Sequence, residues 1–133
     1  MGFSATPSEA LGSLEPLLGG VRREMDLAIQ SDQPGLQELV PLVAHFQGKM
    51  LRPALTLTCV ELCGADPKSN AARVLSATVE LIHISTLVHD DVLDEADLRR
   101  NTPTINALRG NEAAVILGDW LLSLIHISEP TRH

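Results

Sequence analysis

The chain of 133 residues contains no tyrosine and only 2% aromatic residues, so its core must be built from aliphatic side chains. Hydrophobic residues still make up 44% of the sequence and charged residues 20%, which is ordinary for a soluble globular protein. A composition rich in leucine, alanine and valine favours helices over a sheet. No alternating strand pattern persists, and no internal repeat is present. The sequence therefore predicts an all-α protein with one small domain.

Basic residues are also scarce. Lysine and arginine number 10 against 17 aspartates and glutamates, which gives a formal net charge of −7 at neutral pH. A protein that binds nucleic acid needs a basic face to neutralise phosphates, so this balance argues against nucleic acid as a partner. It does not exclude a phosphorylated substrate whose contacts are mediated by Mg²⁺ and local basic side chains.

The sequence has only two cysteines, Cys59 and Cys63, and no second Cys/His pair with zinc-like spacing. We expect free, buried thiols in a reducing compartment. No apolar run is expected to reach the roughly 18–20 residues that cross a bilayer. The N-terminus lacks the basic segment and apolar core of a signal peptide. These absences predict a cytoplasmic protein without a membrane span.

Hydrophobic periodicity and the positions of proline and glycine predict a loose leader over residues 1–12 and then five helices. The second helix should be kinked or split at Pro41, and the third should end at Gly64. The expected helices cover about 13–29, 36–46, 53–64, 70–98 and 111–121.

Asp90, Asp91 and Asp94 form a D-D-x-x-D cluster at the end of the longest apolar helix. Neighbouring carboxylates repel each other by roughly 1 kcal/mol per pair in water, and more when half-buried. Acidic residues at a helix end usually form a solvated surface, but a helix that is apolar on several faces is expected to be buried. We predict that a cation compensates the cluster, and oxygen-only ligands favour Mg²⁺.

Basic residues near the cluster indicate a phosphate site. Arg99 and Arg100 follow it directly, and a guanidinium group suits bidentate binding of phosphate oxygens. Lys49 and Arg52 flank the start of the third helix, whose N-terminus favours an anion. His83 lies two turns before Asp90 on the same helical face. The alternative for Lys49 and Arg52 is that both are solvated surface cations. The alternative for His83 is that its hydrogen bonds are satisfied within the core. His89 adjoins the aspartates and is a candidate for orienting them.

Four motifs in one order resemble those of the trans-isoprenyl diphosphate synthases, or polyprenyl synthetases. The resemblance spans roughly residues 14–122. The motifs are Gly-Lys-Met-Leu-Arg-Pro, Glu-Leu-Ile-His-Ile-Ser-Thr-Leu-Val-His-Asp-Asp-Val-Leu-Asp, Leu-Arg-Arg-Asn-Thr-Pro-Thr and Leu-Gly-Asp-Trp-Leu-Leu.

The resemblance implies the N-terminal helices of an isoprenoid-synthase-type bundle, truncated, and a homodimer at full length. It also implies head-to-tail condensation of isopentenyl diphosphate with an allylic diphosphate. Asp90, Asp91 and Asp94 would bind Mg²⁺ bridged to the allylic diphosphate, which Arg99 would contact. The basic residues assigned to isopentenyl diphosphate would be Lys49, Arg52, His83 and Arg100.

The chain departs from the family pattern at two positions. Met50 replaces the usual first arginine of the basic motif, and Asn101 replaces a glycine, a mild change because both tolerate a left-handed turn. Ser85 and Thr86 are small where bulky aromatics limit product length in the family, so we expect a long-chain product.

Two alternatives remain open beside the prenyltransferase. A non-catalytic subunit of a heteromeric synthase usually lacks the aspartate cluster that this chain carries. A class I terpene cyclase shares the cluster but needs no second diphosphate site, which the pairs Lys49/Arg52 and Arg99/Arg100 would provide.

The end of the chain departs from the family abruptly after residue 122. Residues 123–133 resemble the translation of a sequencing adapter and are expected to be non-native. Residues 13–122 would then be the N-terminal part of the family domain, without its second aspartate-rich motif. We expect this chain to be inactive alone, and poorly soluble or molten because its apolar faces lack their partners.

Overall fold

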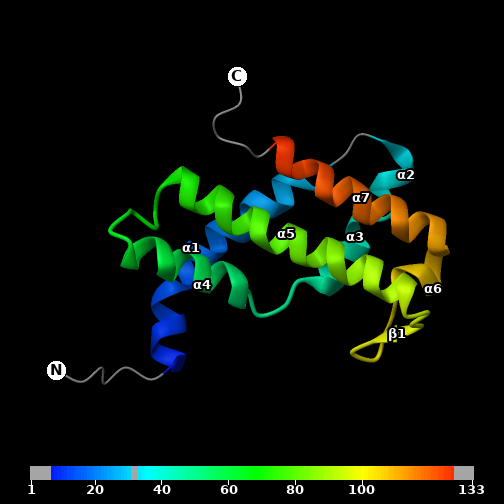
Figure 1. Ribbon diagram of the computed structural model, residues 1–133, viewed down its shortest axis with the longest axis horizontal. Helices are drawn as coiled ribbons and strands as arrows, with labels where there is room; N and C mark the ends of the chain where they lie inside the picture. The colour runs from blue at the N-terminus through cyan, green and yellow to red at the C-terminus, as the bar shows by residue number, and fades with distance from the viewer. Residues whose placement is uncertain (1–6, 31–32, 128–133) are drawn as a thin grey trace.

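The computed structural model describes residues 7–30 and 33–127, and this part of the chain is almost entirely helical (Figure 1). Its strands are two residues long each and pair in one antiparallel hairpin. The predicted all-α class is therefore confirmed. The elements are α1 (Pro7–Ala28), α2 (Pro34–Gln37), α3 (Val40–Val43), the 3-10 helix η1 (Ala44–Phe46), α4 (Leu51–Leu62), α5 (Asn70–Leu93), β1 (Leu98–Arg99), β2 (Thr102–Pro103), α6 (Ile105–Arg109) and α7 (Asn111–Ile127).

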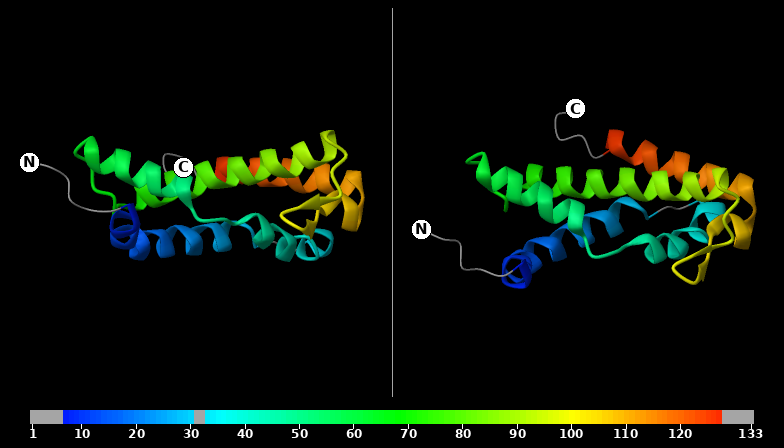
Figure 2. Two further views of the ribbon diagram at one scale, coloured as in Figure 1. Left: turned by 90° about the horizontal axis from the view of Figure 1, so that it is seen from below. Right: turned by 60° about the horizontal axis from the view of Figure 1, so that its bottom comes forward.

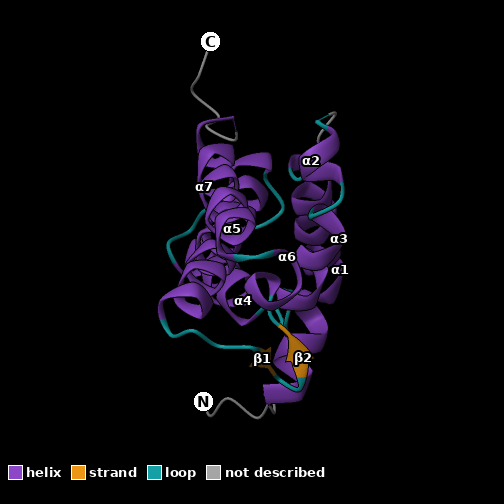
Figure 3. Ribbon diagram, turned by 90° about the vertical axis from the view of Figure 1, so that its right-hand side faces the viewer, coloured by secondary structure: helices purple, strands orange, loops and turns teal. Residues whose placement is uncertain are grey.

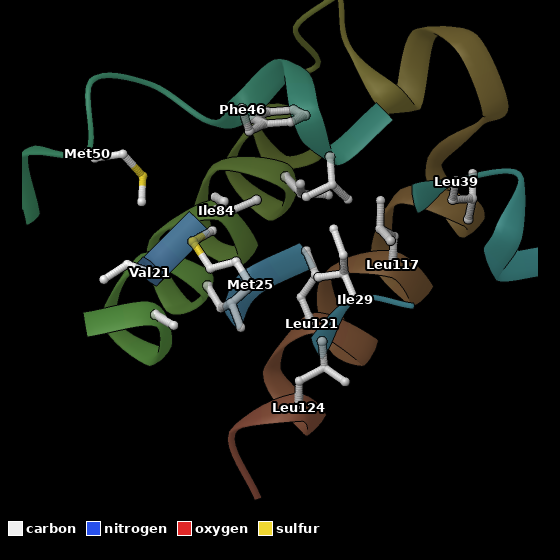
Figure 4. Packing of buried hydrophobic residues seen from close by; sticks show 14 of the residues in the cluster. Val21, Met25, Ile29, Leu39, Phe46, Met50, Ile84, Leu117, Leu121 and Leu124 are labelled. Atoms are coloured by element: carbon white, nitrogen blue, oxygen red, sulfur yellow. The ribbon is translucent and has the colours of Figure 1, made fainter. Parts of the chain in front are cut away.

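Helix α5 is the centre of the arrangement and packs against α1, α4 and α7. The helices form two layers, with α4, α5 and α7 in one and α1 with the short helices α2 and α3 in the other (Figures 2 and 3). The aliphatic core lies between these layers, where Met25 of α1, Ile84 of α5 and Leu117 of α7 are each fully buried (Figure 4). The predicted aliphatic core is thus observed.

The first helix begins earlier than predicted, at Pro7, so residues 7–12 are not a loose leader. Proline is tolerated in the first turn of a helix because its missing N–H is not needed there, and Glu9, Ala10 and Leu11 are good helix formers. Residues 1–6 lie outside the described part of the chain.

The predicted second helix is broken, as expected, into α2, α3 and η1. The break precedes Pro41, which is the second residue of α3, where a missing N–H costs nothing. The third helix ends as predicted, since Gly64 follows α4 with a left-handed φ of 84°.

The longest helix ends earlier than predicted, at Leu93 instead of about Leu98. The expected loop over 101–110 contains part of the hairpin and the short helix α6. Thr104 is the N-cap of α6, because its hydroxyl oxygen accepts a hydrogen bond from the Ala107 N–H at 3.2 Å.

Helix α7 continues past residue 122 to Ile127, over the first residues of the predicted non-native segment. Leu124 is 3% exposed and belongs to the core (Figure 4). Residues 128–133 lie outside the described part of the chain, and the origin of residues 123–133 stays a prediction.

Helix α5 is long and apolar enough to cross a membrane, contrary to the expectation that no segment is. Half of its apolar window is buried within the protein, and core helices of soluble proteins pass the same test. Cys59 and Cys63 are free, as predicted, but both are exposed on α4 and its C-terminal cap, so the expectation of buried thiols is wrong.

Helices α5 and α7 approach each other closely at Gly118. The Ser85 hydroxyl donates a hydrogen bond to the Gly118 carbonyl at 3.0 Å, and a β-carbon on Gly118 would overlap the His89 imidazole. We expect Gly118→Ala to lower the free energy of unfolding by about 1–3 kcal/mol, measured by urea denaturation. Gly19→Ala in α1 is the matched control, because no neighbouring side chain lies within 4 Å of where its β-carbon would be and a helical alanine should be neutral or stabilising. Equal effects of the two changes would contradict the close approach.

Candidate functional site

The aspartate cluster lies at the C-terminal cap of α5. Asp94 is the cap residue, and the chain turns through Glu95, whose φ of 52° is left-handed. The Ala96 N–H donates to the Asp91 carbonyl at 2.9 Å and the Glu95 N–H to the Val92 carbonyl at 3.2 Å, the pattern of a Schellman cap. Carboxylates at this end face the negative pole of the helix dipole, so their position is electrostatically unfavourable without a cation.

Asp91 has its cation within the chain. Its carboxylate is almost fully buried and accepts hydrogen bonds from Arg99 Nε at 3.1 and 3.0 Å and from Arg99 Nη2 at 2.6 Å. These hydrogen bonds raise the pKa of Arg99, and the charges of Asp91, Asp90 and Asp94 add to the rise against the opposing effect of burial. The Arg99 guanidinium also lies 6.0 Å from the centre of the Phe46 ring, within cation–π range.

The hairpin after the cap places the two arginines. Arg99 pairs with Thr102, and the two-residue loop between them consists of Arg100 and Asn101 with φ of 50° and 64°. Two positive φ angles in a two-residue loop match a type I′ turn. Asn101 therefore adopts the left-handed conformation that its position in the motif predicts.

Two residues that the sequence analysis missed fix the segment between α5 and β1. The Ala96 carbonyl accepts hydrogen bonds from the Thr104 hydroxyl at 2.8 Å and from Asn106 Nδ2 at 2.9 Å. Thr104 is 1% exposed, so its hydroxyl serves the structure of the loop and is not available to a ligand. A threonine directly before an apolar residue is a common helix-start signal and could have indicated Thr104.

The five predicted basic residues all line one pocket. Its volume is about 360 Å³, within the range of small-molecule sites. The loop before α4 and the first turn of α4 supply one side, α5 a second and the hairpin a third. The basic lining residues are Lys49, Arg52, His83, Arg99 and Arg100.

The electrostatics of the pocket favour an anion. Burial lowers the pKa of His83, and the positive charges of Arg52, Arg99 and Arg100 lower it further. His83 is therefore held in its neutral form at neutral pH, in which one ring nitrogen donates and the other accepts. Lysine and arginine side chains therefore share the lining of the pocket with a hydrogen-bonding imidazole.

Glu80 is a pocket residue that the sequence analysis did not single out. It is 3% exposed, and its Oε2 atom is buried without a hydrogen-bond partner among the described residues. Burial raises the pKa of Glu80, while the charge of Arg52 acts in the opposite direction. Its position three residues before His83, on the same face of α5, could have indicated it.

The three aspartates are not gathered round one point. Asp91 is turned inward to Arg99, whereas Asp90 and Asp94 are exposed, and their carboxylates have no hydrogen-bond or ion-pair partner within residues 7–30 and 33–127. Among these same residues, no group of three His, Cys, Asp or Glu side chains is arranged to hold a metal ion. The donor chemistry of Asp90 and Asp94 nevertheless fits Mg²⁺, since both present free carboxylate oxygens beside the phosphate-binding cations.

His89 faces away from the aspartates, toward α7. Its Nε2 atom lies 3.2 Å from the Val115 carbonyl and 3.4 Å from Asp119 Oδ1. These contacts join the last turns of α5 to α7. They support a structural role for His89 in place of the orienting role that its sequence position suggests.

Comparison with known sequences identifies relatives that differ in product. Over 121 residues the chain is 45% identical to the all-trans-nonaprenyl-diphosphate synthase (geranyl-diphosphate specific) of Rhodobacter capsulatus, covering 86% of this chain and 37% of that protein. It is 47% identical over 79 residues to the (2E,6E)-farnesyl diphosphate synthase of Mycobacterium tuberculosis (strain ATCC 25618 / H37Rv), covering 59% of this chain and 21% of that protein.

Comparison with solved structures supports the same grouping. The polyprenyl synthase of Caulobacter crescentus CB15, solved in complex with calcium and isoprenyl diphosphate, matches with a TM-score of 0.79 and 31% identity. The match covers 96% of this chain and 38% of that one, so the chain spans well under half the length of these relatives. The family model of polyprenyl synthetase matches residues 33–128, which is more than half of the chain. The chain therefore belongs to the polyprenyl synthetase family.

Proposed function

We propose that the chain is the N-terminal part of a Mg²⁺-dependent trans-prenyltransferase that condenses isopentenyl diphosphate with an allylic diphosphate. The observation that carries this proposal is the convergence of five basic residues on one pocket beside the aspartate-capped end of α5. We call this chain, continued by the remainder of the family domain, the complete enzyme.

The basic residues divide between two diphosphates in this proposal. Lys49, Arg52, His83 and Arg100 bind the diphosphate of isopentenyl diphosphate, and Arg99 binds that of the allylic substrate. The side chains approach the pocket from three separate segments, so they surround an anion instead of meeting it on one side. A terpene cyclase would need only one of these diphosphate sites.

Charge stabilisation is the main chemical task of the site. The allylic carbon–oxygen bond breaks, the diphosphate leaves with the electron pair, and the double bond of isopentenyl diphosphate forms the new carbon–carbon bond before a proton is lost. Mg²⁺ held by Asp90, Asp91 and Asp94 would neutralise the leaving diphosphate. Arg99, which pairs with Asp91 in the structure, would also help to stabilise the charge that develops there.

A direct experiment tests the reaction. The complete enzyme is incubated with isopentenyl diphosphate, an allylic diphosphate and Mg²⁺, and the products are separated by chromatography and identified by mass spectrometry. The proposal requires prenyl diphosphates longer than the allylic substrate by whole isoprene units. A cyclised hydrocarbon, or consumption of the allylic substrate alone, would favour the cyclase.

Product length is a further part of the proposal. We propose a long-chain product because Ser85 and Thr86 are small, as the resemblance suggests. Ser85 is buried against α7, but Thr86 is exposed on α5 and is the position at which a larger side chain has room.

We therefore expect Thr86→Phe in the complete enzyme to shorten the product, because the ring would obstruct the growing chain, whereas Thr86→Ala should keep the wild-type length. Mass spectrometry of the products measures both. A wild-type product no longer than farnesyl diphosphate would contradict the long-chain assignment.

Exposed apolar side chains support the view that more of the domain packs on this chain. Leu55 and Leu62 on α4 are 66% and 81% exposed, and Ile116 on α7 is 58% exposed. They are available for packing against further helices of the family domain. The homodimer, the cytoplasmic location and the inactivity of the isolated chain belong to this proposal as well, and light scattering of the complete enzyme tests the first of them.

A further inference from the structure

Glu80 is an exception among the residues that line the basic pocket. The described lining residues include five basic side chains, and Glu80 is the one acid among them. It lies in the middle of α5, a helix whose buried face is otherwise mainly aliphatic. A buried carboxyl oxygen without a hydrogen bond costs roughly 1–3 kcal/mol. An unpartnered buried carboxyl at this position therefore calls for a physical explanation.

Arg52 complements Glu80 across the pocket. It lies in the first turn of α4, it is exposed, and its guanidinium has no hydrogen-bond or ion-pair partner within the described residues. The charge of Arg52 is nevertheless close enough to lower the pKa of Glu80 against the effect of burial. Neither side chain therefore has a direct partner within the described residues, and Arg52 supplies the positive charge that offsets the effect of burial on Glu80.

The shape of the guanidinium group allows it to serve two anions at once. It presents five N–H donors in a planar fork, so one edge can face a carboxylate while the other faces a phosphate. Lysine lacks this rigid fork, because its ammonium is a compact point charge on a flexible stem. A buried carboxylate behind Arg52 would hold the fork over the pocket.

We propose that Glu80 is a positioning residue that holds the Arg52 guanidinium over the pocket for the diphosphate of the homoallylic substrate. This inference rests on the proposed function and adds a residue to it. Glu80 itself does not touch the reacting carbon atoms. Its effect is confined to the affinity for the diphosphate that Arg52 binds.

The test compares Glu80→Gln with the wild-type complete enzyme. Glutamine has nearly the same size but no charge, so the Arg52 guanidinium would lose the opposite charge that orients it, and we expect the dissociation constant for inorganic diphosphate and the KM for isopentenyl diphosphate to rise about tenfold. The kcat and the KM for the allylic substrate should stay within about twofold of wild type. Glu61→Gln is the matched control, because Glu61 is an exposed glutamate on α4 outside the pocket.

Variants of Arg52 test whether Glu80 acts through it. Arg52→Gln should weaken diphosphate binding, and adding Glu80→Gln to it should cause no further loss, because the two act as one unit. Arg52→Lys should also weaken binding, although it keeps the charge. This second variant keeps the inference testable if Glu80→Gln fails to fold.

Several outcomes would overturn the inference. They are unchanged or tighter diphosphate binding in Glu80→Gln, losses that add in the double variant, wild-type affinity in Arg52→Lys, and a fall in kcat alone. A complete enzyme that binds inorganic diphosphate but forms no prenyl product would contradict the proposed function, while the binding comparison would still decide the role of Glu80. An enzyme that does not bind diphosphate at all would overturn both.

Discussion

Asp90→Asn in the complete enzyme should lower kcat by about three orders of magnitude, comparable to the loss of a principal group that stabilises transition-state charge. Asp90 is exposed in the last turn of α5, and no protein cation pairs with it within the described residues. Its carboxylate is therefore available to a metal ion, and asparagine keeps its size but not its charge. Steady-state kinetics at saturating Mg²⁺ would measure the change.

Asp97→Asn is the matched control for this prediction. Asp97 is an exposed aspartate in the loop that follows α5, outside the D-D-x-x-D cluster, and the Thr104 N–H donates to its backbone carbonyl. It should retain near-normal turnover. Near-normal activity of the Asp90 variant would refute the metal role, and equal losses in both variants would indicate a general effect of charge.

Arg99→Met should lower the free energy of unfolding of the complete enzyme by about 3 kcal/mol, because it would leave the buried Asp91 carboxylate without its cation. Asp91 is 3% exposed, and Arg99 supplies all three of its side-chain hydrogen bonds. Methionine has a similar length but cannot donate. Urea denaturation followed by circular dichroism measures the loss.

The double variant Asp91→Asn with Arg99→Met should recover a large part of this stability, because no buried charge remains to be compensated. Arg109→Met is the control, since Arg109 forms a longer ion pair with Glu38, at 3.5 Å, between two largely exposed side chains. A loss of the same size in Arg109→Met, or no loss in Arg99→Met, would show that burial of the pair does not matter.

The helices were largely predictable because each leaves a local signal. Apolar periodicity marked α1, α4, α5 and α7, and Gly64 marked the end of α4. The end of α5 was not predictable in this way, because neither proline nor glycine follows Leu93 before Leu98 to mark a stop. A Schellman cap whose left-handed residue is Glu95 instead of glycine gives no signal in the sequence.

The basic side of the site was predicted residue by residue, but its acid was not. Lys49, Arg52 and the arginine pair stand out in polar segments, whereas Glu80 stands between the apolar residues Val79 and Leu81 in the middle of a largely apolar helix. Its importance depends on burial, and burial is set by the packing of α5 against α1 and α4. The Asp91–Arg99 pair is likewise a product of the hairpin, which no strand periodicity predicted.

The two hydrogen bonds to the Ala96 carbonyl have a thermodynamic consequence for ligand binding. Thr104 and Asn106 fix the carbonyl of a loop residue that lies between the aspartates and the arginines. A loop that is ordered before its ligand arrives loses little conformational entropy when the ligand binds. Most of the conformational entropy of the acidic and basic groups is therefore lost during folding. The contacts with a diphosphate can then contribute more fully to the affinity.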